Sequence, residues 1–217
     1  MKPIDAELII WDLDGTLIDS KKDIAFAVNE TLERIDHPPI SDEEIYSYVG
    51  NGVRPLIERA VAASGGGNSL DTAIKHFQKI YLAHLLDTTI LFDGILEVLR
   101  HFESKKMAVA SNKPYLYVTK ILSGLHVNDL FISVKGGDSL PTRKPDPEML
   151  NVILQEAETS ADRAVFIGDS AVDIQTGKNA GIRTIGVSYG FRPVAELIKS
   201  APDLLVPTPL DLKRAIR

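Results

Sequence analysis

The stretch LIIWDLDGT, residues 8–16, places four apolar residues directly before two aspartates and a glycine. A short continuous apolar run of this kind predicts a β-strand that is buried on both faces. The polar residues after it predict a loop at the carboxyl end of that strand. Because open α/β sheets bind ligands outside the carboxyl ends of their strands, Asp12 and Asp14 are the first candidates for a functional site.

Similar apolar runs recur in the second half of the chain. They occupy residues 107–110, 131–134, 164–167, 184–187 and 204–206. Between these runs, segments such as 95–102 and 149–154 carry apolar residues at helical spacing. Strands that alternate with helices predict an α/β fold, in which helices cover both faces of a parallel sheet.

Residues 17–90 interrupt this alternation. Apolar residues at helical spacing, such as Ile24, Val28 and Leu32, predict several helices there, and we expect no strand in this range. The sequence therefore predicts two domains. Residues 1–16 and 91–217 form the core, and residues 17–90 form a helical domain inserted after the first strand.

The composition excludes several classes of function. The 217 residues include no cysteine, which excludes disulfides, cysteine zinc sites, iron–sulfur clusters and thiol nucleophiles. The net charge of −6 argues against a dedicated nucleic-acid partner, which requires a basic face. The apolar stretches are too short to cross a membrane, and no signal peptide is apparent, so we expect a cytoplasmic protein without a membrane partner.

Four short segments near the carboxyl ends of the predicted strands carry complementary groups. Asp12 and Asp14 lie in the first, Ser111 in the second, Lys144 in the third, and Asp169 and Asp173 in the fourth. Carboxylates gathered by the sheet repel one another unless cations compensate them. Oxygen ligands without histidine or cysteine nearby favour Mg²⁺. The segments together predict a metal-assisted site for phosphoryl transfer.

Each group has a role in such a site. The Asp12 carboxylate is a candidate nucleophile that takes the phosphoryl group, and Asp14 is a candidate acid for the leaving group and base for water. Gly15 allows backbone N–H groups to approach phosphate oxygens. The Ser111 hydroxyl and the Lys144 ammonium are candidates to bind the same oxygens.

Some of these residues also fit purely structural roles. The pattern Ser170-x-x-Asp173 resembles a capping box, so Asp173 caps a helix, orients Lys144, or does both. The pattern Ser20-x-x-Asp23 predicts a helix N-terminus rather than a site. An isolated Asp-x-Asp-Gly sequence is also compatible with a simple turn.

Taken with the inserted helices, these segments resemble the motifs of the haloacid dehalogenase-like hydrolase superfamily over nearly the whole chain. The resemblance implies a Rossmann-like core with three α/β/α layers and a helical cap domain. It also implies Mg²⁺ bound by Asp12, the main-chain carbonyl of Asp14, and Asp169. Asp12 would then be the nucleophile and Asp14 the general acid and base, with Asp173 supporting the site.

Within this superfamily, the chain is most similar to phosphoglycolate phosphatases. The similarity rests on residues 15–20, 49–54, 111–113 and 136–138. It implies hydrolysis of a small phosphorylated metabolite, 2-phosphoglycolate in the first place, by a monomer or homodimer. The residues expected to bind the substrate or its phosphate are Gly15, Thr16, Ser111, Asn112, Lys144 and Arg54. Arg54 would pair with a substrate carboxylate; the alternative is a solvated arginine at the start of a helix.

Other functions remain compatible with these motifs. A sugar phosphomutase uses the same scaffold but retains its intermediate, and a pyrophosphatase is also possible. A dehalogenase does not require the acid that Asp14 offers. A non-catalytic binding module is disfavoured because all four charged positions of the motifs are present: Asp12, Asp14, Lys144 and Asp169.

Overall fold

The core of the protein is a parallel sheet of six strands. The computed structural model describes residues 2–67 and 70–217. The strands lie in the order β5-β4-β1-β6-β7-β8, and every neighbouring pair is parallel. Their bounds are β1 Leu8–Trp11, β4 Lys106–Ala110, β5 Ser133–Lys135, β6 Ala164–Gly168, β7 Arg183–Val187 and β8 Leu204–Val206. All six strands predicted from the sequence are confirmed.

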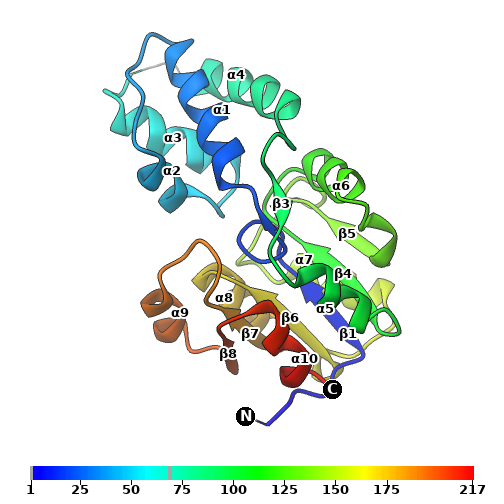
Figure 1. Cartoon of the computed structure of the whole chain (residues 1–217). Helices are drawn as coiled ribbons and strands as arrows, with labels where there is room; N and C mark the ends of the chain where they lie inside the picture. Colours follow the sequence, from blue (N-terminus) through cyan, green and yellow to red (C-terminus); the bar gives the residue numbers. More distant parts are fainter. Residues whose placement is uncertain (1, 68–69) are drawn as a thin grey trace.

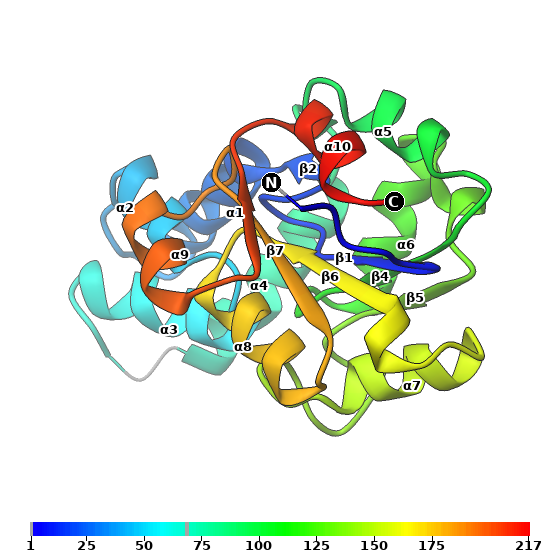
Figure 2. The ribbon, with the colours of Figure 1, turned by 90° about the horizontal axis from the view of Figure 1, so that it is seen from below.

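Strand β1 lies at the centre of the sheet and is buried on both faces. Ile9 and Trp11 pack into one apolar cluster, whereas Leu8 and Ile10 pack into another. This alternation follows from the two-residue period of a strand. Figure 2 shows helices α5 (Ile95–His101), α6 (Tyr115–Gly124) and α10 (Leu212–Ala215) on one side of the sheet, and α7 (Glu148–Glu156) and α8 (Ala171–Asn179) on the other. The core is thus the Rossmann-like, three-layer α/β/α arrangement that the resemblance implied.

Four helices form a separate unit above the carboxyl edge of the sheet (Figure 1). They are α1 (Lys21–Glu33), α2 (Asp42–Tyr48), α3 (Val53–Ala63) and α4 (Leu70–Ala83). Three of them match the apolar spacing in the sequence. Helix α2 was not predicted, because Ile45 is its single buried residue and one residue gives no period.

Two short strands join this helical unit to the core. Strand β2 (Ile18–Asp19) pairs antiparallel with β3 (Ile90–Leu91). The expectation that residues 17–90 contain no strand is therefore wrong at both ends of that range. Strands of two residues are too short to show a hydrophobic period, so the sequence pattern gave no indication of them.

A helix begins at Lys21, as the pattern Ser20-x-x-Asp23 predicted, but the Ser20 side chain does not cap it. Ser20 precedes α1 but makes no side-chain capping hydrogen bond. Its hydroxyl donates instead to Asp14. The Asp23 carboxylate accepts hydrogen bonds from the backbone and hydroxyl groups of Thr88 and Thr89, on the chain that returns to the core. Both polar side chains therefore join separate segments of the chain.

The remaining elements complete the core. Helix α9 (Val194–Ser200) lies beside α8 (Figure 2), and three short 3₁₀ helices connect longer elements. These are η1 (Asn128–Leu130), η2 (Ala161–Arg163) and η3 (Pro209–Asp211). The two ends of the chain meet through hydrogen bonds between Ile4 and Ala215 and between Arg217 and Ile4. Among the described residues, no helix has the length and apolar character needed to cross a membrane.

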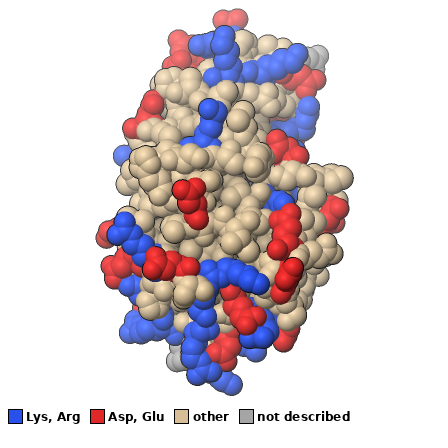
Figure 3. All heavy atoms as spheres, turned by 90° about the vertical axis from the view of Figure 1, so that its right-hand side faces the viewer, with Lys and Arg blue, Asp and Glu red and all other residues tan. Residues whose placement is uncertain are grey.

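One face of the molecule is largely uncharged across its middle (Figure 3). Acidic groups lie at the centre of this area and along its right-hand side, and residues of both charges are interspersed toward the two ends of the view. The charged groups at the carboxyl edge of the sheet contribute little to any surface, because Asp12, Lys113, Lys144, Asp169 and Asp173 are all buried.

Candidate active site

Three loops at the carboxyl edge of the sheet converge beneath the helical unit. Asp12 follows β1, Ser111 follows β4, and Asp169 follows β6. Because β4 and β6 are the two neighbours of β1, the sheet order brings these three loops together. The strand order, which the sequence alone did not provide, explains why residues about 100 and 157 positions apart share one site.

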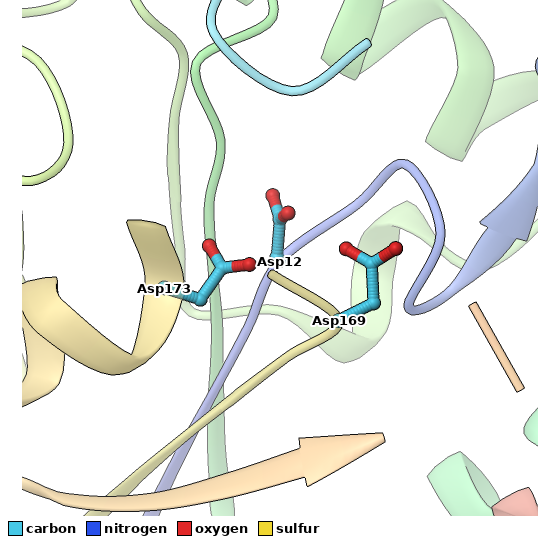
Figure 4. A group of neighbouring side chains, drawn as sticks. All are labelled: Asp12, Asp169 and Asp173. Carbon is cyan, nitrogen blue, oxygen red and sulfur yellow. The ribbon is translucent and has the colours of Figure 1, made fainter. Parts of the chain in front are cut away.

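Three carboxylates form the centre of this site (Figure 4). Asp12, Asp169 and Asp173 each offer an oxygen, and these oxygens lie within 4.8 Å of one another. All three side chains are buried. Buried carboxylates at this spacing repel one another, so the arrangement requires compensating positive charge.

Lys144 provides part of that charge. Its Nζ lies 2.7 Å from Asp173 Oδ1 and 2.8 Å from Asp12 Oδ1. Burial alone would lower the pKa of Lys144, but Asp12 and Asp173 raise it above its ordinary value, so the ammonium stays charged. Asp12 Oδ1 therefore forms a buried ion pair with Lys144, although no described residue makes a well-aligned hydrogen bond to it.

One ammonium group does not balance three carboxylates. Burial and the neighbouring Asp173 raise the pKa of Asp12 to about 7, against the attraction of Lys144. Burial, Asp173 and Asp12 likewise raise the pKa of Asp169. These shifts show that the ionised cluster is short of positive charge. An added divalent cation would supply it, and oxygen ligands suit Mg²⁺.

The surroundings of Asp173 separate it from the other two carboxylates. Its Oδ2 accepts hydrogen bonds from the backbone N–H and hydroxyl of Ser170, which together form a capping box at the start of α8. Its Oδ1 accepts from Lys144. Asp173 therefore both caps the helix and orients Lys144. This leaves Asp12 and Asp169 as the carboxylates with room for a metal ion.

Two glycines lie against Asp169 and leave space for its carboxylate. A Cβ at Gly15, where φ is +80°, would lie 2.2 Å from Asp169 Oδ2. A Cβ at Gly190 would lie 2.3 Å from Asp169 Cβ. The backbone N–H of Phe191 donates to Asp169 Oδ2 at 2.7 Å. Sequence reasoning missed Gly190 and Phe191, although their place just after the strand 184–187 was a usable signal.

Asp14 lies on the other side of Asp12 and has partners of its own. Lys113 Nζ lies 2.8 Å from Asp14 Oδ1 and 3.0 Å from Oδ2. The same ammonium donates to the hydroxyl of Tyr81, on α4 of the helical unit, at 2.7 Å. Sequence reasoning quoted Lys113 within a motif but gave it no role. Tyr81 fits the apolar spacing of α4, and that spacing gave no indication of a functional role.

Of the residues predicted to bind phosphate, some lie in the wall of a cavity and others lie outside it. Ser111 is buried beside Asp12 and Asp14 in the wall of a cavity. Asn112 turns to the backbone of Lys144 and to the carbonyl of Gly50. Thr16 is fully buried, and its hydroxyl has no hydrogen-bond partner among the described residues.

Arg54 lies outside this cavity. Its guanidinium donates to Asp71 at 2.8 Å, and both side chains are exposed. Arg54 does not belong to the cavity wall among the residues that the structure describes. In this arrangement of the chain, the arginine at the start of α3 is a solvated, ion-paired side chain.

The cavity lies between the core and the helical unit. Its wall includes Asp12, Asp14, Ser111 and Lys113 from the core, and Phe77 and Tyr81 from α4. The volume is about 40 Å³, room for roughly three water molecules. Within the described part of the chain, Lys113 is the one basic side chain in this wall.

Comparisons with known proteins identify the class to which this site belongs. The family model of haloacid dehalogenase-like hydrolases matches residues 9–187. A phosphoglycolate phosphatase of Colwellia psychrerythraea is 37% identical over 199 residues, which cover 88% of each chain. One from Psychrobacter arcticus is 37% identical over 197 residues, 87% of this chain and 86% of its own. The crystal structure of a predicted phosphoglycolate phosphatase from Haemophilus somnus superposes with a TM-score of 0.92 at 28% identity, covering 96% and 97% of the two chains.

The chain therefore belongs to the haloacid dehalogenase-like hydrolase family. It is a phosphoric monoester hydrolase, and within the family it is a member similar to the phosphoglycolate phosphatases.

Proposed function

We propose that this protein is a Mg²⁺-dependent phosphatase that hydrolyses a small phosphate monoester, 2-phosphoglycolate in the first place, through a phosphorylated Asp12. The observation that carries the proposal is the cluster of three buried carboxylates, Asp12, Asp169 and Asp173, whose negative charge exceeds that of the one ammonium group, Lys144, that pairs with Asp12 and Asp173. Buried carboxylates with too little positive charge nearby cost free energy unless a cation binds them. The names of the relatives support the choice of substrate.

Asp12, Asp169 and the main-chain carbonyl of Asp14 are the proposed metal ligands. Asp173 is not among them, because Lys144 and Ser170 already use its two oxygens. When bound, Mg²⁺ would reduce the repulsion between the carboxylates and the incoming phosphate and stabilise charge on the transferring phosphoryl group. Asp173 acts on the reaction through the position of Lys144.

The first half of the reaction transfers the phosphoryl group to the protein. An Asp12 oxygen forms a bond to phosphorus while the bond from phosphorus to the ester oxygen breaks. Asp14 supplies the proton that the leaving oxygen needs. Ser111, Lys144 and the backbone at Gly15 bind the phosphoryl oxygens, which carry more charge in the transition state.

The second half releases inorganic phosphate. Asp14 accepts a proton from a water molecule, whose oxygen attacks phosphorus and displaces the Asp12 carboxylate. The nucleophile is thereby regenerated, and Asp14 regains the proton that it gave to the product alcohol. One carboxyl group thus acts as the acid in the first step and as the base in the second.

Residues 17–90 act as a cap domain that opens and closes over the site. The cavity supports this role, because its wall comes partly from the core, with Asp12 and Ser111, and partly from α4, with Phe77 and Tyr81. A movement of the helical unit would therefore widen or narrow the space in which the ester binds. Closure excludes water other than the reacting molecule and brings Tyr81 against Lys113.

A panel of phosphate esters tests this function. Wild-type protein with Mg²⁺ releases phosphate, and activity is lost with a chelator or with Asp12→Asn. Asp129→Asn, at an exposed aspartate of η1, is the matched control and keeps full activity. Mass spectrometry of trapped protein should locate the phosphoryl group on Asp12. Phosphate on another residue, or a rearranged phosphosugar as the product, would contradict the proposal.

A further inference from the structure

Tyr81 has a hydroxyl group that is only partly used. The side chain is buried, with 2% of the residue exposed. Its oxygen accepts a hydrogen bond from Lys113, and within the described residues this is the hydroxyl's one hydrogen bond. An ammonium group has no lone pair, so it cannot accept the phenolic proton. The Tyr81 O–H therefore remains a buried donor without an acceptor, in the wall of the cavity.

Lys113 makes this donor stronger. Its ammonium lies 2.7 Å from the Tyr81 oxygen and 4.7 Å from the centre of the Tyr81 ring. A positive charge on the oxygen side polarises the O–H bond and favours an anionic acceptor. Burial also raises the pKa of Tyr81, so the hydroxyl keeps its proton. The pair therefore presents a donor and a positive charge to the same space.

Tyr81 and Lys113 are the part of the cavity wall that favours a second anionic group. Asp12 and Asp14 are the other charged side chains of the wall among the described residues, and both are acidic. Phe77 stacks on Tyr81, and Tyr117 meets it edge to face, so the ring has a fixed orientation. Arg54, the basic residue that the sequence suggested, is turned away to Asp71.

We propose that Tyr81 and Lys113 form a subsite for the carboxylate of the substrate, so that the enzyme selects short phosphorylated acids over uncharged phosphate esters. This inference rests on the proposed phosphatase function. Tyr81 comes from the helical unit and Lys113 from the core, so a carboxylate bound by both favours the closed arrangement. Lys113 also contacts Asp14, so it affects the hydrolysis of every substrate. Tyr81 affects mainly the substrates that carry a carboxylate.

Two esters of equal length test the subsite. One is 2-phosphoglycolate, and the other is 2-hydroxyethyl phosphate, in which an alcohol replaces the carboxylate. In the wild type, kcat/KM is higher for the acid. Tyr81→Phe, which removes only the hydroxyl, should lower kcat/KM for the acid about tenfold, the usual effect of losing a hydrogen bond to a charged group, and leave the alcohol within about threefold. Lys113→Met lowers both and reduces their ratio.

Tyr117→Phe is the matched control. Its hydroxyl lies in the same wall but already donates to the Gln78 carbonyl at 3.2 Å. This variant should change kcat/KM for both esters by the same factor. An equal loss on both esters in Tyr81→Phe, or a ratio that Tyr117→Phe reduces just as much, would overturn the subsite.

Binding measurements separate this inference from the proposed function. If wild-type protein releases phosphate from neither ester, the proposed function fails. The subsite is then decided by calorimetry on Asp12→Asn with Mg²⁺. The dissociation constant for 2-phosphoglycolate should rise about tenfold when Tyr81→Phe is added, and that for 2-hydroxyethyl phosphate should not. Equal constants for the two esters would overturn the subsite by themselves.

Discussion

Asn112 holds the backbone of Lys144 from both sides. Its Oδ1 accepts the Lys144 N–H at 3.0 Å, and its Nδ2 donates to the Lys144 carbonyl at 3.2 Å. The chain places these residues 32 positions apart, after β4 and before α7. One amide side chain thus fixes the backbone from which the Lys144 ammonium reaches Asp12 and Asp173.

Replacing Asn112 with alanine should therefore lower kcat about 10- to 100-fold. Without Asn112 the backbone of Lys144 is no longer fixed, so the ammonium group that binds the phosphoryl group can shift. Small displacements of a catalytic group reduce kcat by factors of this size. The effect appears in single-turnover phosphate release. Asn179→Ala is the control, because exposed Asn179 donates to the neighbouring carbonyl of Pro145. If both variants lose the same activity, the loss comes from a general disturbance of this region and not from release of the Lys144 backbone.

The sequence predicted most of the core but not the contacts that organise the site. Six apolar runs identified six strands because a strand buried on both faces has a strong signal. Asp12 was found because it directly follows such a run, and Asp169 because it lies two positions after another. The pairing of Asn112 with Lys144 has no local pattern, since it depends on which strand ends are neighbours in the sheet.

Residues whose local sequence pattern also fits a structural role were the hardest to interpret from the sequence. Tyr81 fits the apolar period of α4, so its hydroxyl carried no visible signal. Asp23 lies in the first turn of α1, as its pattern predicted, but its carboxylate also joins α1 to Thr88 and Thr89. In both cases the local sequence pattern also fits a purely structural role. Only the tertiary contacts show the additional role of the side chain.

Replacing Gly15 with alanine should abolish metal-dependent activity. The new Cβ would lie 2.2 Å from Asp169 Oδ2, so the carboxylate must move. Gly181→Ala is the matched control, because Gly181 also has a positive φ, +68°, but open space around it. Both variants lose about 1 kcal/mol of stability through backbone strain. Calorimetry with Mg²⁺ should show weakened binding for Gly15→Ala alone; equal weakening in both would attribute the effect to strain.

Asp23 should make the stability of the protein depend on pH in the acid range. Burial alone raises the pKa of Asp23, but hydrogen bonds from Thr88 and Thr89 lower it more, so the pKa lies below 3.8. The folded state therefore holds the proton less tightly than the unfolded state. The stabilisation is fully present above pH 3.8 and is lost as the pH falls through the lower, folded-state value.

The variant Asp23→Asn tests this dependence by urea unfolding at several pH values. At pH 7 it should be less stable than the wild type by roughly 2 kcal/mol, because an amide nitrogen would face the donors of Thr88 and Thr89. The difference should shrink as the pH falls below 3.8. Because asparagine and aspartate have nearly the same shape, a constant difference at every pH would assign the loss to the amide nitrogen that faces the Thr88 and Thr89 donors, and not to the charge. Asp129→Asn, at an exposed site, controls for the removal of a carboxylate.

Arg192 should stabilise the closed arrangement of the helical unit. Its guanidinium donates to the backbone carbonyls of Ser47, near the end of α2, and of Val49, which directly follows α2. Arg192 directly follows Phe191, whose N–H holds Asp169, so the same loop contacts the helical unit and the carboxylate cluster. Arg192→Ala removes the hydrogen bonds to the helical unit but leaves the Asp169 contact, which uses backbone atoms alone.

Because substrate binding favours the closed form, a smaller closed population raises the apparent dissociation constant by the same factor. We expect KM to rise about fivefold for Arg192→Ala, the effect of about 1 kcal/mol, while kcat changes less than threefold. Small-angle scattering without substrate should show a longer maximum dimension. Arg183→Ala, at the exposed start of β7, should change neither quantity. A fall in kcat with KM unchanged would instead mean that Arg192 acts through the position of Asp169, because only then is the reaction step itself affected.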